Sequence, residues 1–321
     1  MLFRSEVAII TANLIRLKRE NAVLDRDVVA FFNADEEAGG DANGVEWMVS
    51  EHRDLIDADL VINDDAGKML SLNGAPLWNT IQTSEKAYAT YEIDAQGAGG
   101  HSSLPRRDNA IARLARAVAK IDAYQFPVRL GETSHRYLAA MQDRVPAKES
   151  SAIKALLRNS ADVGAMETLR ENPVINAQLH STCPVTLISG GQSESALPMK
   201  ATATIQCRLL PDENPQEVLA TFARVIGDPG ITVKAAWGPL SSPAQPLDPA
   251  ITAVVERISQ EFWPNVSVVP FMSVAPTSSN GPKYSPGWFS LPLNIRCSNR
   301  CANPLRPTGS SLLPTWYQTL T

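Results

Sequence analysis

The sequence predicts an α/β protein with two parts, an open α/β sheet domain and an inserted ferredoxin-like α+β domain. Two observations support this fold class. A strand, a helix and a strand follow one another within residues 28–67, as in a βαβ unit. Residues 82–239 then give the order β-α-β-β-α-β of a ferredoxin-like module, and a helix at 248–264 resumes the first part.

This pattern divides the chain into four segments. We expect residues 1–81 to begin the sheet domain, 82–239 to form the inserted domain, and 240–274 to return to the sheet domain. Residues 275–321 form a tail of different character, because they contain no Asp or Glu, carry seven prolines and show no apolar periodicity. The composition of this tail disfavours a sheet strand or a core helix in it.

Composition excludes several classes of function. The chain has 321 residues, of which 44% are hydrophobic, and a net charge of −5 without a dense Lys/Arg block. We therefore expect no nucleic-acid and no membrane partner. No apolar run is long enough for a membrane span, and Arg4 and Glu6 interrupt any signal peptide, so the sequence predicts a soluble chain with its localisation unknown. Four cysteines are too few for a disulfide scaffold.

The first part contains acidic residues where strands should end. Residues 6–20 predict an amphipathic helix, and 43–56 predict a second helix. Val28–Phe32 is a short, continuously apolar run, typical of a strand buried on both faces, and 58–67 predicts another such strand. Ligands bind at the carboxyl ends of strands in open α/β sheets, so we expect three carboxylates to converge there: Glu36, Glu37 and Asp64.

The inserted domain is predicted element by element. Its strands are expected at 86–95, 183–191, 200–210 and 230–237, and its helices at 108–124 and 214–227. Strict alternation of apolar and polar residues marks 200–210, while Asn214 and Pro215 mark the start of a helix. An extra segment at 127–178 predicts further helices.

Four motifs, in this order and spacing, resemble those of the dinuclear zinc amidohydrolases: "ADEEAGG", "VINDDAG", "GAGGHSSLPRRDNAI" and "ISGGQSESALPMKATATIQCRLLPDENP". That family includes aminoacylases, succinyl-diaminopimelate desuccinylases, carnosine dipeptidases and glutamate carboxypeptidases. The resemblance spans roughly residues 6–274. It implies a zinc metallopeptidase or amidohydrolase that cuts an amide bond next to a free carboxylate, with two zinc ions per site. It also implies that the inserted domain is a lid through which two copies form a homodimer.

The resemblance assigns roles by position. Glu36 would be the general base, Glu37 would ligate one zinc, and Asp64 the other, with Asp65 the weaker alternative. His101 would reach across the dimer interface to stabilise the oxyanion of the scissile amide.

On the lid, Arg208 would bind the substrate carboxylate, and Ser195 stands where the family usually has a substrate-binding asparagine. Substrates of this kind are N-acyl amino acids and dipeptides.

Simpler interpretations compete with these roles. The "DEE" run can be solvated surface charge, "NDD" an Asx turn, and Arg208 a solvent-facing residue. A further set of residues is expected to have no catalytic or metal-binding role: His52, His135, His180, Cys297 and Cys301.

The sequence also departs from the family pattern. The His-x-Asp motif, the bridging aspartate and the C-terminal histidine of the family have no counterparts, so three of five metal ligands are missing. Glu37 and Asp64 alone would hold zinc weakly, because zinc sites normally use three or four protein ligands. We expect an N-terminally truncated member with a tail altered by a reading-frame change, inactive as written. Two alternatives stay open, a non-catalytic dimerising remnant and a ligand-binding module without metal chemistry.

Overall fold

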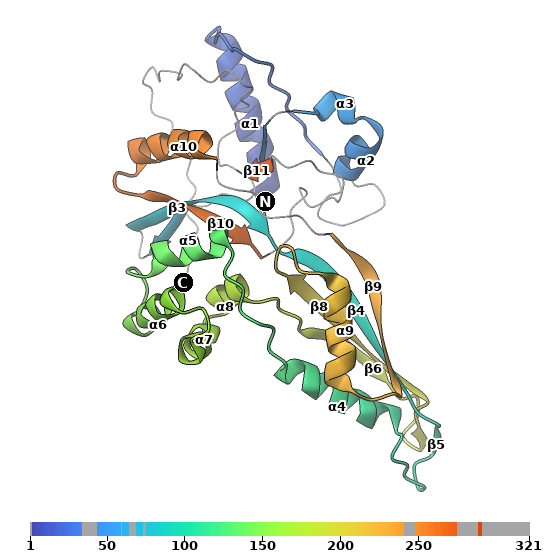
Figure 1. The fold of residues 1–321 in the computed structure, drawn as a ribbon. Helices are drawn as coiled ribbons and strands as arrows, with labels where there is room; N and C mark the ends of the chain where they lie inside the picture. The colour runs from blue at the N-terminus through green and yellow to red at the C-terminus, as the bar shows by residue number, and fades with distance from the viewer. Residues whose placement is uncertain are drawn as a thin grey trace. The chain divides into compact units, whose positions relative to one another are not determined.

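The computed structural model describes residues 2–33, 44–58, 60–63, 69–72, 75–240, 248–274 and 288–290 (Figure 1). The chain divides into two compact units. The first comprises residues 1–83, 245–271 and 277–321, and the second residues 84–244 and 272–276. Each contains helices and a β-sheet, which confirms the predicted mixed α/β fold class. Among the described residues, no helix combines the length and the apolar character that crossing a membrane requires.

The first unit is built on a five-stranded sheet of order β1-β11-β3-β10, with β2 paired to β3. Its strands are β1 Val61–Asn63, β2 Met69–Leu72, β3 Ala75–Glu85, β10 Ser267–Ser273 and β11 Trp288–Ser290, and its helices are α1 Leu2–Arg19, α2 Gly44–Glu51, α3 Arg53–Ile56 and α10 Pro249–Phe262. β1 runs parallel to β11, whereas β11 and β2 run antiparallel to β3. The predicted helices at 6–20, 43–56 and 248–264 are therefore present, the second with a break at His52.

Packing of α10 against β3 holds this sheet. Ile81 on β3 and Val255 on α10 are buried together. Beside them the Asn79 amide donates a buried hydrogen bond of 3.0 Å to the Ser259 hydroxyl. Such a paired polar contact avoids the cost of burying either group alone.

The structure of this unit differs from the sequence-based predictions at several points. Val28–Phe32 forms no strand, and Val29 is 49% exposed, because no described strand pairs with the run. An apolar run becomes a strand only where neighbours satisfy its backbone groups. Of the predicted strand at 58–67, Val61–Asn63 form β1, whose described partner is β11, and residues 59 and 64–67 lie outside the described residues. β11 itself lies in the tail, where composition disfavoured any strand. β3 was not predicted at all, since its buried polar residues break the alternation.

The second unit has the predicted ferredoxin-like order. Its strands are β4 Ala87–Gln96, β5 Gly100–His101, β6 Val185–Gly190, β7 Ala196–Leu197, β8 Lys200–Leu209 and β9 Ile231–Leu240, and its helices are α4 Ala110–Ala123, α5 Glu132–Met141, α6 Ala147–Arg158, α7 Val163–Arg170, α8 Pro173–Leu179 and α9 Pro215–Ile226. The main sheet is antiparallel, with the order β6-β8-β4-β9, and β5 pairs with β7 separately (Figure 1).

Alternation along β8 and β4 separates the two faces of this sheet. On β8 the buried residues are Ala201, Ala203, Ile205, Cys207 and Leu209, and they join a core with Leu114 of α4 and Phe222 of α9. The residues between them, such as Arg208, lie on the opposite face, called the helix-free face here because α4 and α9 pack on the other one. The predicted cap at Asn214 is also present, because its side chain accepts a hydrogen bond from the backbone N–H of Gln216.

Helices α5 to α8 fill the segment predicted to be an extra helical insertion. Successive helices contact one another, and they bury Leu138, Ile153 and Leu169. The backbone N–H of Arg129 donates to the carbonyl of Leu179 at 3.1 Å, so the chain enters and leaves this insertion at one place.

Candidate functional site

The predicted site residues fall into two groups. Glu36, Glu37, Asp64 and Asp65 lie outside the residues that the structure describes, so the predicted base and zinc ligands have no geometry here. Within the described ranges, no group of three or more His, Cys, Asp and Glu side chains could hold a metal ion. The remaining predicted residues all lie in the second unit: His101, Ser195 and Arg208.

Arg208 lies near the end of β8, held by both neighbouring strands. Its backbone exchanges two hydrogen bonds with Thr182, of 2.8 Å and 3.0 Å. On the other side it stands directly opposite Tyr88 of β4, and the guanidinium carbon lies 4.8 Å from the centroid of that ring. The buried Nη1 atom has no hydrogen-bond partner among the described residues. Burial lowers the pKa of this guanidinium, which nevertheless stays charged at any physiological pH.

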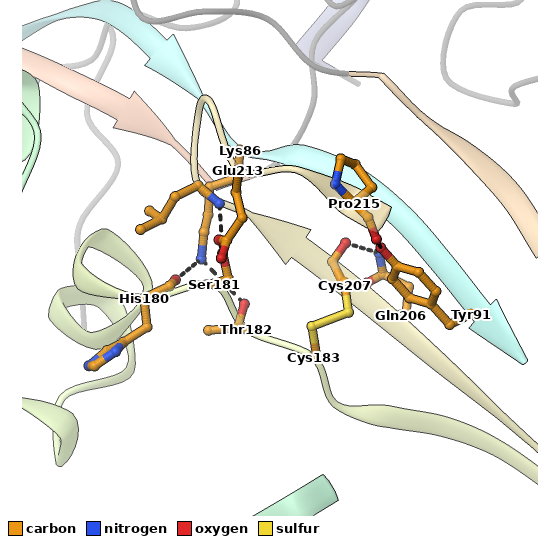
Figure 2. The surroundings of a disulfide bond; sticks show 11 residues. Lys86, Tyr91, His180, Ser181, Thr182, Cys183, Gln206, Cys207, Glu213 and Pro215 are labelled. Carbon is orange, nitrogen blue, oxygen red and sulfur yellow. Dashed lines mark hydrogen bonds between the residues drawn. A yellow bond between two sulfur atoms is a disulfide. The ribbon is translucent and has the colours of Figure 1, made fainter. Parts of the chain in front are cut away.

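A disulfide bond fixes the strands next to Arg208. Cys183, just before β6, is bonded to Cys207 of β8, and Cys207 is fully buried (Figure 2). The two cysteines are cross-strand neighbours, with Cα atoms 4.1 Å apart. Sequence analysis missed this bond, because a spacing of 24 residues says nothing unless the strand register is known.

A buried polar cluster lies beside the disulfide. Lys86 is completely buried, and its ammonium group donates to the carbonyl of His180 at 2.5 Å and to the Thr182 hydroxyl at 3.4 Å (Figure 2). Desolvation lowers the pKa of Lys86 to about 7, although the negative charge of Glu213 acts in the opposite direction. Glu213 in turn accepts a hydrogen bond from the Ser181 hydroxyl. Burial also lowers the pKa of His180, whose Nδ1 lies 2.7 Å from the carbonyl of Phe126, so this histidine is structural, as expected.

His101 and Ser195 come together in a separate two-stranded ribbon. His101 pairs with Ala196 across β5 and β7, and the backbone N–H of Ser102 donates to the Ser195 carbonyl at 2.9 Å. The backbone N–H of Ser103 donates to Nδ1 of His101 at 3.2 Å. A donor of this kind requires an unprotonated Nδ1, so the neutral ring carries its proton on Nε2. His101 thus presents an exposed N–H donor, the group that stabilisation of an oxyanion requires.

His101 and Arg208 do not meet within one copy of the chain. β7 precedes Lys200 at the start of β8, whereas Arg208 is near the end of that strand. Eight residues of strand separate Lys200 from Arg208, which corresponds to roughly 26 Å at about 3.3 Å per residue. The ribbon that carries His101 therefore lies beyond the start of β8, whereas Arg208 lies near the end of that strand.

One edge of this sheet exposes apolar side chains. β6 is its edge strand, and both Leu187 and Ile188 are 67% exposed there. Ile111 of the adjacent helix α4 is also exposed, close to Gly190 at the end of β6. An exposed edge with large apolar side chains is a typical site for pairing with another chain.

Comparison with known proteins agrees with this architecture. Residues 83–233 match the model of the peptidase dimerisation domain of the M20 type. The probable carboxypeptidase S-like 2 of Dictyostelium discoideum is 27% identical over 62% of this chain and 38% of its own length. The N-fatty-acyl-amino acid synthase/hydrolase PM20D1 of Homo sapiens is 26% identical over 62% of this chain and 40% of its own length. The chain thus spans about two fifths of these curated relatives.

Among solved structures, the M20 family metallo-carboxypeptidase Sso-CP2 from Sulfolobus solfataricus is similar with a TM-score of 0.49 and 18% identity, over 77% of this chain and 66% of that one. The aminopeptidase PepT from Bacillus cereus has a TM-score of 0.44 and 14% identity, over 81% and 54% of the two chains. Residues 83–233 thus match a peptidase dimerisation domain of the M20 type, in agreement with the family resemblance of the sequence motifs.

Proposed function

We propose that this chain belongs to a metal-dependent hydrolase of amide bonds next to a free carboxylate, in which the second unit is a dimerising lid that binds the carboxylate. One observation carries the proposal. The buried Nη1 of Arg208 lacks a partner within the described part of the chain, on the helix-free face of a dimerisation domain. The names of the relatives, which refer to carboxypeptidases and to N-fatty-acyl-amino acids, fit a substrate that carries a carboxylate.

The energetics of Arg208 favour an anionic ligand. A buried donor without a partner costs about 1–3 kcal/mol, and more when the group is charged. A substrate carboxylate removes that cost, because it can accept two parallel hydrogen bonds from a guanidinium group. A neutral amide in the same place can accept only one.

A second copy of the chain completes the site. Since the ribbon of His101 lies beyond the start of β8 and Arg208 lies near its end, a substrate contacts both only if another copy supplies one of them. The exposed apolar edge at β6 offers the surface for that association, with Ile188 and Ile111 on the helix-bearing side of the sheet. His101 would then donate its Nε2–H to the developing oxyanion.

The roles of the acidic residues rest on the family resemblance. In this proposal Glu36 would be the general base, and Glu37 and Asp64 would be ligands of zinc, which would supply Lewis acidity at the site. Ser195, next to His101 in the ribbon, would contact the substrate in place of the usual asparagine.

A binding experiment tests the proposal without requiring turnover. Calorimetric titration of the full chain with N-acetylphenylalanine and with its carboxamide compares a charged ligand with a neutral one. We expect the carboxylate to bind more tightly, and Arg208→Met to remove the difference. Arg158→Met is the matched control, since Arg158 is an exposed arginine of helix α6. Equal binding of the two ligands by the wild-type chain would refute carboxylate recognition.

Turnover is tested separately. With added zinc, hydrolysis of N-acyl amino acids that disappears in Glu36→Gln supports a working enzyme. Ligand binding and dimerisation without hydrolysis would instead support the non-catalytic alternative.

A further inference from the structure

We propose that Tyr88 is a positioning residue that holds the Arg208 guanidinium in the orientation that receives a planar carboxylate; this inference rests on the proposed function. Tyr88 is not part of any of the four motifs that carry the family resemblance. It belongs to β4, whereas Arg208 belongs to β8, and the two stand directly opposite each other in the antiparallel pair.

The geometry of the pair leaves the donors of Arg208 free. The guanidinium carbon lies 4.8 Å from the centroid of the Tyr88 ring, within the range of a cation–π contact. All five N–H bonds of a guanidinium lie in its own plane. The ring face is not a carbonyl or carboxylate acceptor, so this contact stabilises the guanidinium without pairing its N–H donors with a protein oxygen, and Nη1 has no partner among the described residues.

The surrounding charges explain why an aromatic ring suits this place. Lys86 is close enough for its charge and that of Arg208 to disfavour each other. Glu213 favours the charge of Lys86, and a carboxylate of the protein beside Arg208 would stabilise that cation in the same way. Such a carboxylate would also occupy the N–H donors and compete with the substrate. The face of Tyr88 stabilises the cation electrostatically, and the donors remain available.

The strand register places Tyr88 and Arg208 on the same face of the sheet. Tyr88 alternates with the buried residues Ala87 and Ala89, so it must lie on the helix-free face together with Arg208. On the far side of β8, Thr182 holds the Arg208 backbone through two hydrogen bonds, and the neighbouring disulfide joins the same two segments. Arg208 is thus restrained on both sides, at its backbone by Thr182 and at its guanidinium by Tyr88.

Titration of full-length variants with N-acetylphenylalanine tests the inference. Tyr88→Leu should weaken binding of this carboxylate by roughly 2- to 30-fold, the range expected for loss of a cation–π contact. Tyr88→Phe and Tyr88→Trp keep an aromatic face and should remain within about 2-fold of the wild type. Thr90→Val is the control, because Thr90 lies two residues further along the same face of β4. Binding of the carboxamide should be the same in all these variants.

The outcomes separate the inference from the proposed function. If Arg208→Met weakens carboxylate binding but Tyr88→Leu does not, Tyr88 has no positioning role, and the proposed function stands. If Tyr88→Phe weakens binding as much as Tyr88→Leu, the hydroxyl group acts rather than the ring, and the inference is wrong. If Arg208→Met has no effect, both the inference and the proposed function are wrong. Should Tyr88→Leu fail to fold, Tyr88→Trp and Tyr88→Phe still decide whether an aromatic face is sufficient.

Discussion

Replacing the buried Lys86 with methionine should change how the stability of the second unit depends on pH. Lys86 is completely buried, and desolvation lowers its pKa from 10.5 to about 7. A tenfold change in a proton-binding constant corresponds to about 1.4 kcal/mol. Protonated Lys86 therefore destabilises the folded state by about 5 kcal/mol relative to a lysine with an ordinary pKa.

The sign follows from the protons bound in each state. Between pH 7 and 10.5 the unfolded chain holds the proton more tightly than the folded chain, so the free energy of unfolding rises with pH. The slope approaches about 1.4 kcal/mol per pH unit, so the free energy of unfolding should rise by roughly 2 to 3 kcal/mol between about pH 7.5 and 9.5. Three other buried groups with shifted pKa values in the described part of the chain titrate outside this window. The pKa of His180 is lowered below 6.5, and burial raises the pKa of Tyr91 and Tyr137 to about 12.

Urea unfolding followed by circular dichroism at about pH 7.5, 8.5 and 9.5 measures the slope. Lys86→Met should remove this pH dependence and should raise the free energy of unfolding at pH 7. The gain is smaller by about 1 kcal/mol because the hydrogen bond to the His180 carbonyl is lost. Lys120→Met is the matched control, since Lys120 is exposed and also donates to a backbone carbonyl, that of Ile226. It should keep the wild-type slope. A wild-type stability that does not change across the window would refute the reasoning.

Three further predictions concern the same unit. Cys183→Ser/Cys207→Ser removes a disulfide that closes a loop of 24 residues and should cost about 3 kcal/mol in chemical unfolding; equal stability with and without reductant would contradict it. Ile188→Lys should shift the chain towards monomer in sedimentation at micromolar concentration, because it puts a charge on the exposed edge strand, whereas Val163→Lys, on helix α7, should not. Asn214→Ala removes the cap of α9 and should lower the free energy of unfolding by about 1 kcal/mol, while Asn214→Asp should retain it.

The sequence predicted the elements whose local signals agree with their surroundings. Apolar and polar residues alternate along β8 because one of its faces packs against α4 and α9. Helix α9 begins where Asn214 and Pro215 predict a cap and a first turn. Val28–Phe32 shows the opposite case, since an apolar run cannot reveal whether a neighbouring strand exists to pair with it. The 11-residue strand β3 escaped prediction because it buries polar residues such as Gln82.

Only those residues of the candidate site that belong to a recognisable sequence motif could be predicted. His101, Ser195 and Arg208 were identified from motifs, and the structure adds that the first two share one ribbon, whereas Arg208 lies far along β8. Tyr88 and the disulfide depend on register between strands distant in sequence, which no local pattern encodes.

The way the chain enters and leaves the α5 to α8 insertion has a consequence for how this domain can vary. Because the backbone N–H of Arg129 donates a hydrogen bond to the Leu179 carbonyl, the ends of the insertion are adjacent. A segment whose ends are adjacent can change in length at small entropic cost. A change in the length of this insertion leaves the strand register unaltered, because the insertion lies between α4 and β6. The insertion is therefore the part of the domain where relatives can gain or lose whole helices, and a short linker in its place should leave the four-stranded sheet intact.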